Sequence, residues 1–147
     1  MEKTFKLIAS SENLTRFRSQ LKILLDQSGL IEKKSGEVLL AIQEVLTNIL
    51  KHGYRGKPSE VTITYTDEPD QITITVQDSG KKFDMTQHAD PKLPPDKPGG
   101  LGIYLIKTSM DKVSYDKNCK NGNLLRLIKF KKERKENQIK DMKEVQP

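Results

Sequence analysis

The sequence predicts an α+β domain, a two-layer sandwich in which helices cover one face of a mixed, mostly antiparallel sheet. Two segments carry apolar residues at steps of three and four, which is the signature of amphipathic helices. Several shorter segments alternate apolar and polar residues, and turn sequences separate two pairs of them, as in hairpins. Helices and strands that are apolar on one face bury these faces against each other when they pack as two layers.

The first part of the chain is expected to form one strand and two helices. Residues 4–9 are predicted to form a strand, and residues 11–28 a helix followed by Gly29. A second helix is predicted over residues 36–52, closed by Gly53. The buried stripe of this second helix would consist of Val38, Ile42, Val45 and Ile49.

Two hairpins are expected to complete the sheet. Residues 60–66 and 71–77 alternate apolar and polar side chains on either side of a short acidic turn. Residues 113–115 and 123–130 are predicted to pair across the Asn-Gly sequence at 121–122, which is a strong turn signal. Each hairpin would place one apolar face toward the helices.

Composition limits the domain count and the compartment. The chain has 147 residues, 34% of them hydrophobic, which suffices for one core. We expect residues 1–130 to form this domain, and residues 131–147, with mixed charges and few apolar side chains, to form a frayed or disordered tail. The chain has no apolar run of about 18 residues and no apolar signal segment, so we expect a cytoplasmic protein without membrane insertion.

Charge and cysteine content exclude further classes. The net charge is +6, but the basic residues are interleaved with acids, and no aromatic stacking set or helix-turn-helix pattern accompanies them. Direct nucleic-acid binding is therefore not expected. Cys119 is the only cysteine, which excludes an intramolecular disulfide, and the two histidines provide no zinc ligand set with it.

A first polar pair lies beside the apolar stripe of the second helix. Glu44 and Asn48 are four residues apart, so they lie one turn above each other on one face. A carboxylate and an amide oxygen suit Mg²⁺, with Asn48 as the ligand and Glu44 as a base or water holder. Taken alone, the pair is also compatible with ordinary exposed positions of an amphipathic helix.

A second motif follows directly from a predicted strand. Asp78 stands at the end of that strand, and Gly80 lets the backbone turn close to a ligand. A carboxylate fixed at a strand end can accept a hydrogen bond from an exocyclic amine such as that of adenine. An ordinary Asp-Ser-Gly turn is the alternative.

A third motif is a glycine cluster, Gly99, Gly100 and Gly102, just before an apolar helical segment. Backbone amides at such a loop can approach phosphate oxygens, and the start of the helix adds partial positive charge. Glycine also occurs at ordinary helix starts. The polar, proline-rich segment 85–98 that precedes the cluster is expected to form a mobile lid.

In this order, the three motifs resemble the GHKL ATPase superfamily, and most closely its bacterial anti-sigma factor serine kinases. The resemblance covers roughly residues 4 to 130, and the run from Gly99 to Ile106 is especially typical of that subfamily. It implies the Bergerat-type fold of histidine kinase-like ATPases, with ATP and Mg²⁺ as cofactors.

The resemblance also assigns roles to individual residues. Glu44 is similar to the family's general base, Asn48 to its Mg²⁺ ligand and Asp78 to the residue that reads the adenine amine. His52 could approach the phosphates or ribose, or could simply be a satisfied histidine at the helix end. The other expected nucleotide contacts are Gly80, Phe83, Gly99, Gly100, Leu101 and Gly102.

The implied activity is transfer of the γ-phosphoryl group of ATP to a serine or threonine of a partner protein. The implied partners are a sigma factor, which the chain would sequester, and a STAS-type anti-sigma antagonist, which it would phosphorylate. Arg16 and Arg18 resemble positions of partner contact, and a homodimer is expected. The alternative is a nucleotide-dependent binding module without kinase turnover.

One departure concerns charge neutralisation. The predicted lid contains no arginine, so no residue is singled out to neutralise the transferred phosphoryl group. The candidates, by charge alone, are Lys81, Lys82, Lys92 and Lys97. Each is also compatible with an ordinary solvated lysine.

Overall fold

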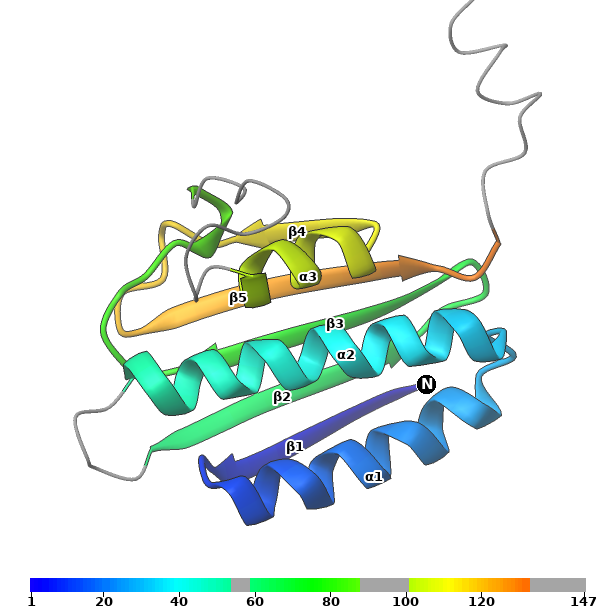
Figure 1. Ribbon diagram of the computed structural model, residues 1–147, viewed down its shortest axis with the longest axis horizontal. Helices are drawn as coiled ribbons and strands as arrows, with labels where there is room; N and C mark the ends of the chain where they lie inside the picture. The colour runs from blue at the N-terminus through cyan, green and yellow to red at the C-terminus, as the bar shows by residue number, and fades with distance from the viewer. Residues whose placement is uncertain (54–58, 88–100, 133–147) are drawn as a thin grey trace, which may run out of the picture.

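The chain folds into two layers, as the computed structural model shows for residues 1–53, 59–87 and 101–132 (Figure 1). Three α-helices lie side by side on one face of a five-stranded sheet. The predicted α+β sandwich is therefore confirmed. No helix of the described residues is long and apolar enough to cross a membrane.

The order of the elements agrees with the expected one. They are β1 (Glu2–Ile8), α1 (Ser11–Gln27), α2 (Glu32–Asn48), a π-helical turn (Ile49–Gly53), β2 (Glu60–Asp67), β3 (Gln71–Asp78), a 3-10 turn (Met85–Gln87), α3 (Leu101–Ser109), β4 (Lys112–Tyr115) and β5 (Asn123–Phe130). The sheet order is β1-β2-β3-β5-β4, and all four pairings of these strands are antiparallel rather than mixed.

Helix α2 differs most from its expected bounds. It begins at Glu32, because Gly36, the expected first residue, is tolerated inside the helix. The α-helical hydrogen bonding ends at Asn48, and a π-helical turn continues the chain to Gly53. Single π-turns of this kind occur frequently at functional sites.

Helix α1 matches its prediction because its start and end signals are local. The Ser10 side chain caps the helix by accepting a hydrogen bond from the Asn13 backbone N–H at 3.1 Å. Gly29, just beyond the end of the helix, has a φ of +83°, a conformation that glycine adopts without strain. The residues of α1 that are buried are Phe17, Leu21, Leu24 and Leu25.

The core lies between the helices and the inner face of the sheet. The predicted stripe of α2 is buried from Val38 to Ile49, and alternate residues of the central strands meet it. The fully buried side chains of β2 and β3 are Val61, Ile63, Tyr65, Ile72 and Ile74. Packing α2 against this face holds one side of the helix in the core and leaves its neighbouring side available for polar residues.

A buried lysine ties the end of the sheet to two helices. Lys129 in β5 is only 4% exposed, and its Nζ lies 2.6 Å from Glu37 Oε2 of α2 and 2.5 Å from the carbonyl oxygen of Ser109, the last residue of α3. Burial of an ammonium group is tolerated when such partners replace its water.

The second predicted hairpin is confirmed, and its turn packs on the end of β3. Gly122 has a φ of +80°, and a Cβ atom added there would lie 1.9 Å from the Asp78 carbonyl oxygen. Only glycine fits this position, because both the backbone conformation and the close approach exclude a side chain.

We predict that Lys129→Ala lowers the free energy of unfolding by about 3 kcal/mol, because it leaves the Glu37 carboxylate and the Ser109 carbonyl without their partner. Lys22→Ala is the matched control, since Lys22 forms an exposed pair with Asp26 and should cost less than about 0.5 kcal/mol. Urea unfolding followed by circular dichroism measures both, and equal losses would contradict a structural role for Lys129.

We also predict that Gly122→Ala destabilises the fold more than Gly29→Ala. Both glycines have positive φ, so both substitutions should cost about 1–2 kcal/mol from the backbone. Nothing lies within 4 Å of a Cβ atom at Gly29, whereas at Gly122 the Asp78 backbone must move. The same urea titration compares the two variants, and indistinguishable midpoints would show that the turn is not packed as described.

Candidate functional site

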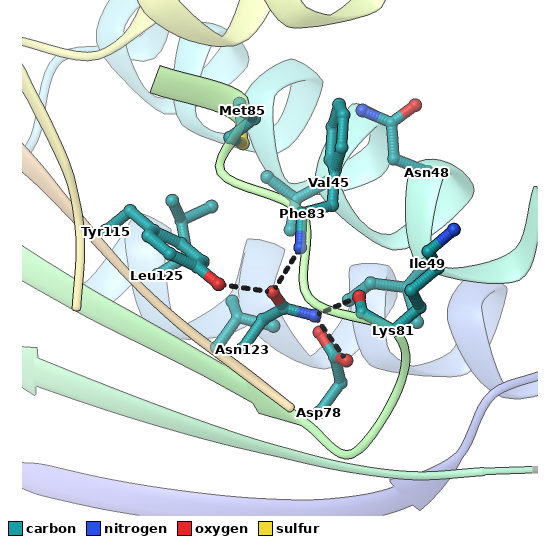
Figure 2. Close-up of a pocket in the computed structure, with 11 residues that line it drawn as sticks. Val45, Asn48, Ile49, Asp78, Lys81, Phe83, Met85, Tyr115, Asn123 and Leu125 are labelled. Atoms are coloured by element: carbon teal, nitrogen blue, oxygen red, sulfur yellow. Dashed lines mark hydrogen bonds between the residues drawn. The ribbon is translucent and has the colours of Figure 1, made fainter. Parts of the chain in front are cut away.

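A pocket lies between α2 and the end of the sheet formed by β3, β4 and β5 (Figure 2). It contains about 550 Å³ of space, part of which is open to solvent. Its lining is Val45, Asn48, Ile49, Val76, Asp78, Lys81, Phe83, Met85, Tyr115, Asn123 and Leu125. Apolar walls with a few convergent polar groups are typical of small-molecule sites.

Asp78 lies at the inner end of this pocket. It is the last residue of β3 and is 7% exposed. Its Oδ1 accepts hydrogen bonds from the Gly80 backbone N–H at 2.8 Å and from Asn123 Nδ2 at 3.1 Å. Asp78 thus forms the local Asp-Ser-Gly turn and also lines the pocket, so the turn does not prevent the predicted contact with a ligand. Gly80 shapes that turn.

Asn123 is a site residue that the sequence analysis missed. Besides Asp78, its Nδ2 donates to the carbonyl oxygen of Lys81 at 2.9 Å. Its Oδ1 accepts from the Phe83 backbone N–H at 2.9 Å and from the Tyr115 hydroxyl at 2.8 Å. An amide side chain has two donor hydrogens and two acceptor lone pairs, so its hydrogen-bonding capacity is filled. Figure 2 shows Asn123 at the centre of this network.

Tyr115 supports the network from β4. Burial raises the pKa of its hydroxyl, and the negative charge of Asp84 raises this pKa further. The protonated hydroxyl donates a hydrogen bond to Asn123 Oδ1. Because the hydroxyl donates, the amide of Asn123 is held with its oxygen toward Tyr115 and its nitrogen toward Asp78.

Phe83 forms part of the pocket wall. It is 45% exposed although it is a large apolar residue, whereas Met85, which also lines the pocket, is buried. An exposed aromatic ring beside a cavity is suited to stacking on a flat ligand. The predicted contribution of Phe83 to a nucleotide site is therefore compatible with its position.

The structure brings the first and third motifs together. A Cβ atom added to Gly102, in the first turn of α3, would lie 2.7 Å from Glu44 Oε2 and 3.9 Å from Asn48 Oδ1. Glycine at this position therefore lets the start of α3 approach both polar residues of α2. Leu101 begins α3 and is 38% exposed.

Asn48 also fits a site that a ligand completes. Its Nδ2 is one of two buried side-chain polar atoms of the described residues that lack a hydrogen-bond partner. Buried polar groups without partners are uncommon in folded proteins. The Nδ2 group can only donate, for example to a phosphate oxygen, whereas the Oδ1 atom is the one suited to Mg²⁺, whose remaining ligands would be phosphate oxygens and water.

Other expected site residues are placed as follows. Lys81 lines the pocket, and Lys82 is exposed beside it. His52 lies in the π-helical turn that follows Asn48. The expected residues Gly99, Gly100, Lys92 and Lys97, together with positions 88–98 of the predicted lid and residues 133–147 of the predicted tail, lie outside the described residues.

Comparison with known proteins agrees with this arrangement. The model of the histidine kinase-like ATPase domain family matches residues 7–129. A serine-protein kinase RsbW from Listeria monocytogenes is 30% identical over 124 residues, which cover 77% of this chain and 79% of that protein. A serine-protein kinase RsbW from Bacillus pumilus is 28% identical over 136 residues, which cover 85% and 83% of the two chains.

A solved structure supports the fold independently. The crystal structure of the RsbU and RsbW domains of a Mycobacterium tuberculosis protein matches 88% of this chain with a TM-score of 0.65 and 15% sequence identity. The match covers 32% of that longer chain. The family match, the RsbW relatives and the shared fold agree, and the chain belongs to the histidine kinase-like ATPase family.

Proposed function

We propose that this chain is an anti-sigma factor serine/threonine kinase that binds ATP with Mg²⁺ and phosphorylates a partner protein. The main supporting observation is the juxtaposition of Glu44 and Asn48 with Gly102, next to a pocket that ends at the buried Asp78. The match to relatives named serine-protein kinases, which covers most of their length, supports the same activity.

The adenine ring would occupy the apolar part of the pocket. The Asp78 carboxylate would accept a hydrogen bond from the exocyclic amine, which a guanine base does not present at that position. Phe83, Met85 and Ile49 offer apolar surface to the faces of the ring. Burial of Asp78 favours selectivity, because guanine would place its carbonyl oxygen, a second acceptor, against the buried carboxylate.

The phosphates would extend from this pocket toward α2 and α3. The Asn48 side chain and the close approach at Gly102 would hold the triphosphate and its metal ion. Gly80, Gly99, Gly100, Leu101 and His52 are the further nucleotide contacts that we propose. When bound, Mg²⁺ neutralises charge on the phosphate oxygens.

Glu44 would serve as the general base. Its partly exposed carboxylate, beside Gly102, can accept the proton from a serine or threonine hydroxyl of the partner. The hydroxyl oxygen forms a bond to the γ-phosphorus while the bond between this phosphorus and the bridging oxygen breaks. ADP leaves with the electron pair, and the proton stays on Glu44 until solvent removes it.

The partners that we propose are a sigma factor, which the chain sequesters, and a STAS-type antagonist, which it phosphorylates. Arg16 and Arg18 are exposed on α1, where their planar guanidinium groups are available to a partner protein. We also propose a homodimer that uses the face of the sheet opposite the described helices (Figure 1). Outward residues of this face include Thr64, Thr75 and Ile128, all partly exposed.

We predict that Asn48→Ala abolishes detectable Mg·ATP binding, because it removes the proposed metal ligand. Glu44→Ala should retain Mg·ATP binding and lose phosphoryl transfer by about 100-fold or more, because the general base acts in the chemical step. Calorimetric titration measures binding, and transfer of label from radioactive ATP to a purified STAS-type antagonist measures activity.

Glu32→Ala is the control, since Glu32 is an exposed carboxylate at the opposite end of the same helix. It should leave both quantities unchanged. Asn48→Ala binding Mg·ATP as well as the parent would contradict the metal role. If the parent chain bound Mg·ATP but modified no antagonist, the binding module without kinase turnover would be favoured.

We predict that Gly102→Ala lowers phosphoryl transfer by about tenfold or more, because a 1 Å displacement of a catalytic group can cost up to about 100-fold. The added Cβ atom would meet Glu44 Oε2 at 2.7 Å and push the carboxylate aside. Gly36→Ala is the matched control, since nothing lies within 4 Å of its added Cβ atom. It should raise helix stability by about 0.5–1 kcal/mol and leave activity unchanged. Equal activity of the two variants would exclude this contact as a constraint on Glu44.

A further inference from the structure

The segment that follows β3 depends on one side chain of another strand. Asn123 contacts this segment at Asp78, at the Lys81 carbonyl and at the Phe83 N–H. The first of these contacts orients a carboxylate, and the other two hold the backbone between them. The same segment is also held by a contact between the Ser59 and Ser79 hydroxyls and by the burial of Met85, but Asn123 is the side chain that joins three of its points to β5.

We infer that Asn123 is the positioning residue of the adenine end of the site, and that Tyr115 acts through it. The inference rests on the proposed ATP site and concerns two residues, Asn123 and Tyr115, that have no part in the proposed phosphoryl transfer. Asn123 sets the direction of the Asp78 carboxylate and the place of the Phe83 ring, and the Tyr115 hydroxyl sets the orientation of the Asn123 amide.

The filled capacity of Asn123 supports a positioning role. All four of its hydrogen-bonding positions are used by protein groups, so the amide is held in one orientation. An amide in this state has no remaining donor or acceptor with which to bind a ligand directly. Its influence on a nucleotide would therefore pass through Asp78 and Phe83, which line the pocket.

The backbone next to Asn123 restricts it further. Gly122 packs directly on the carbonyl of Asp78, and the β3–β5 pairing places Asp78 opposite Asn123. The side chain of Asn123 thus starts from a backbone that cannot move independently of β3. In a hydrogen-bond network of this kind, removal of one side chain weakens several contacts at once.

The test compares Asn123→Ala, Tyr115→Phe and the double variant by calorimetric titration with ATP and GTP in the presence of Mg²⁺. Asn123→Ala should weaken ATP binding by about tenfold or more and reduce the preference for ATP over GTP. Tyr115→Phe alone should weaken ATP binding by about threefold. In the double variant, Tyr115→Phe should add nothing, because Tyr115 acts only through Asn123.

Two further variants separate positioning from general stability. Asn123→Asp keeps the size of the side chain but removes both donor hydrogens, so it should lose at least as much affinity as Asn123→Ala. Tyr65→Phe removes a tyrosine hydroxyl that donates to the Leu24 carbonyl in the core, away from the pocket. It should leave ATP affinity unchanged even where it lowers the unfolding midpoint.

A second measurement does not depend on nucleotide. Hydrogen exchange in the ligand-free protein should become faster at the Phe83 amide in Asn123→Ala and in Tyr115→Phe, while the β2 amides keep their rates.

Unchanged exchange and unchanged ATP affinity in Asn123→Ala would overturn the inference. A further loss from Tyr115→Phe in the Asn123→Ala background would overturn the role given to Tyr115. If the parent chain bound no Mg·ATP, the proposed function would fail, and the exchange rates would still decide the role of Asn123.

Discussion

The packing of α2 is the constraint on which the rest of the structure depends. One side of this helix must fill the core between α1, α3 and the sheet, and that requirement fixes its rotation about its own axis. Once the rotation is fixed, Glu44 and Asn48 both lie on the side of α2 that faces the start of α3. The start of α3 meets them there, and glycine at position 102 makes the meeting possible. Core packing and site geometry are therefore set by the same helix.

The sheet contributes the other end of the site through strand register. The β3–β5 pairing places Asp78 opposite Asn123, although 45 residues separate them in the sequence. A shift of one residue in this register would turn every side chain of β5 to the other face and separate this pair. Gly122 and the tight contact of its turn with the Asp78 carbonyl help to exclude such a shift.

Features with local signals were predictable from the sequence. The stripe of α2, the end of α1 at Gly29 and the Asn-Gly turn depend on neighbours within a few residues, and the sequence predicts all three. The early start of α2 is not predictable in this way, because Gly36 favours a helix boundary although glycine costs only about 1 kcal/mol inside a helix.

Features that depend on distant pairing were not predictable. Residues 123–130 carry apolar side chains on both faces, so the alternation did not show that Lys129 points inward. Asn123 resembled an ordinary first residue of a strand, because its partners come from β3, β4 and the segment between Asp78 and Phe83. For the candidate site, the resemblance of the three motifs to a known family predicts that Glu44, Asn48 and Gly102 lie together, whereas the network that supports Asp78 requires the folded sheet.

The division of the site between the two layers has a consequence for how ligands of different length would be held. The base would be recognised by the sheet, through Asp78, and the terminal phosphate by the helices, through Asn48 and the start of α3. A nucleoside triphosphate would therefore contact both layers, whereas a diphosphate would contact mainly the sheet. After phosphoryl transfer, ADP would therefore stay bound through its base, while its contacts with the helices would be lost.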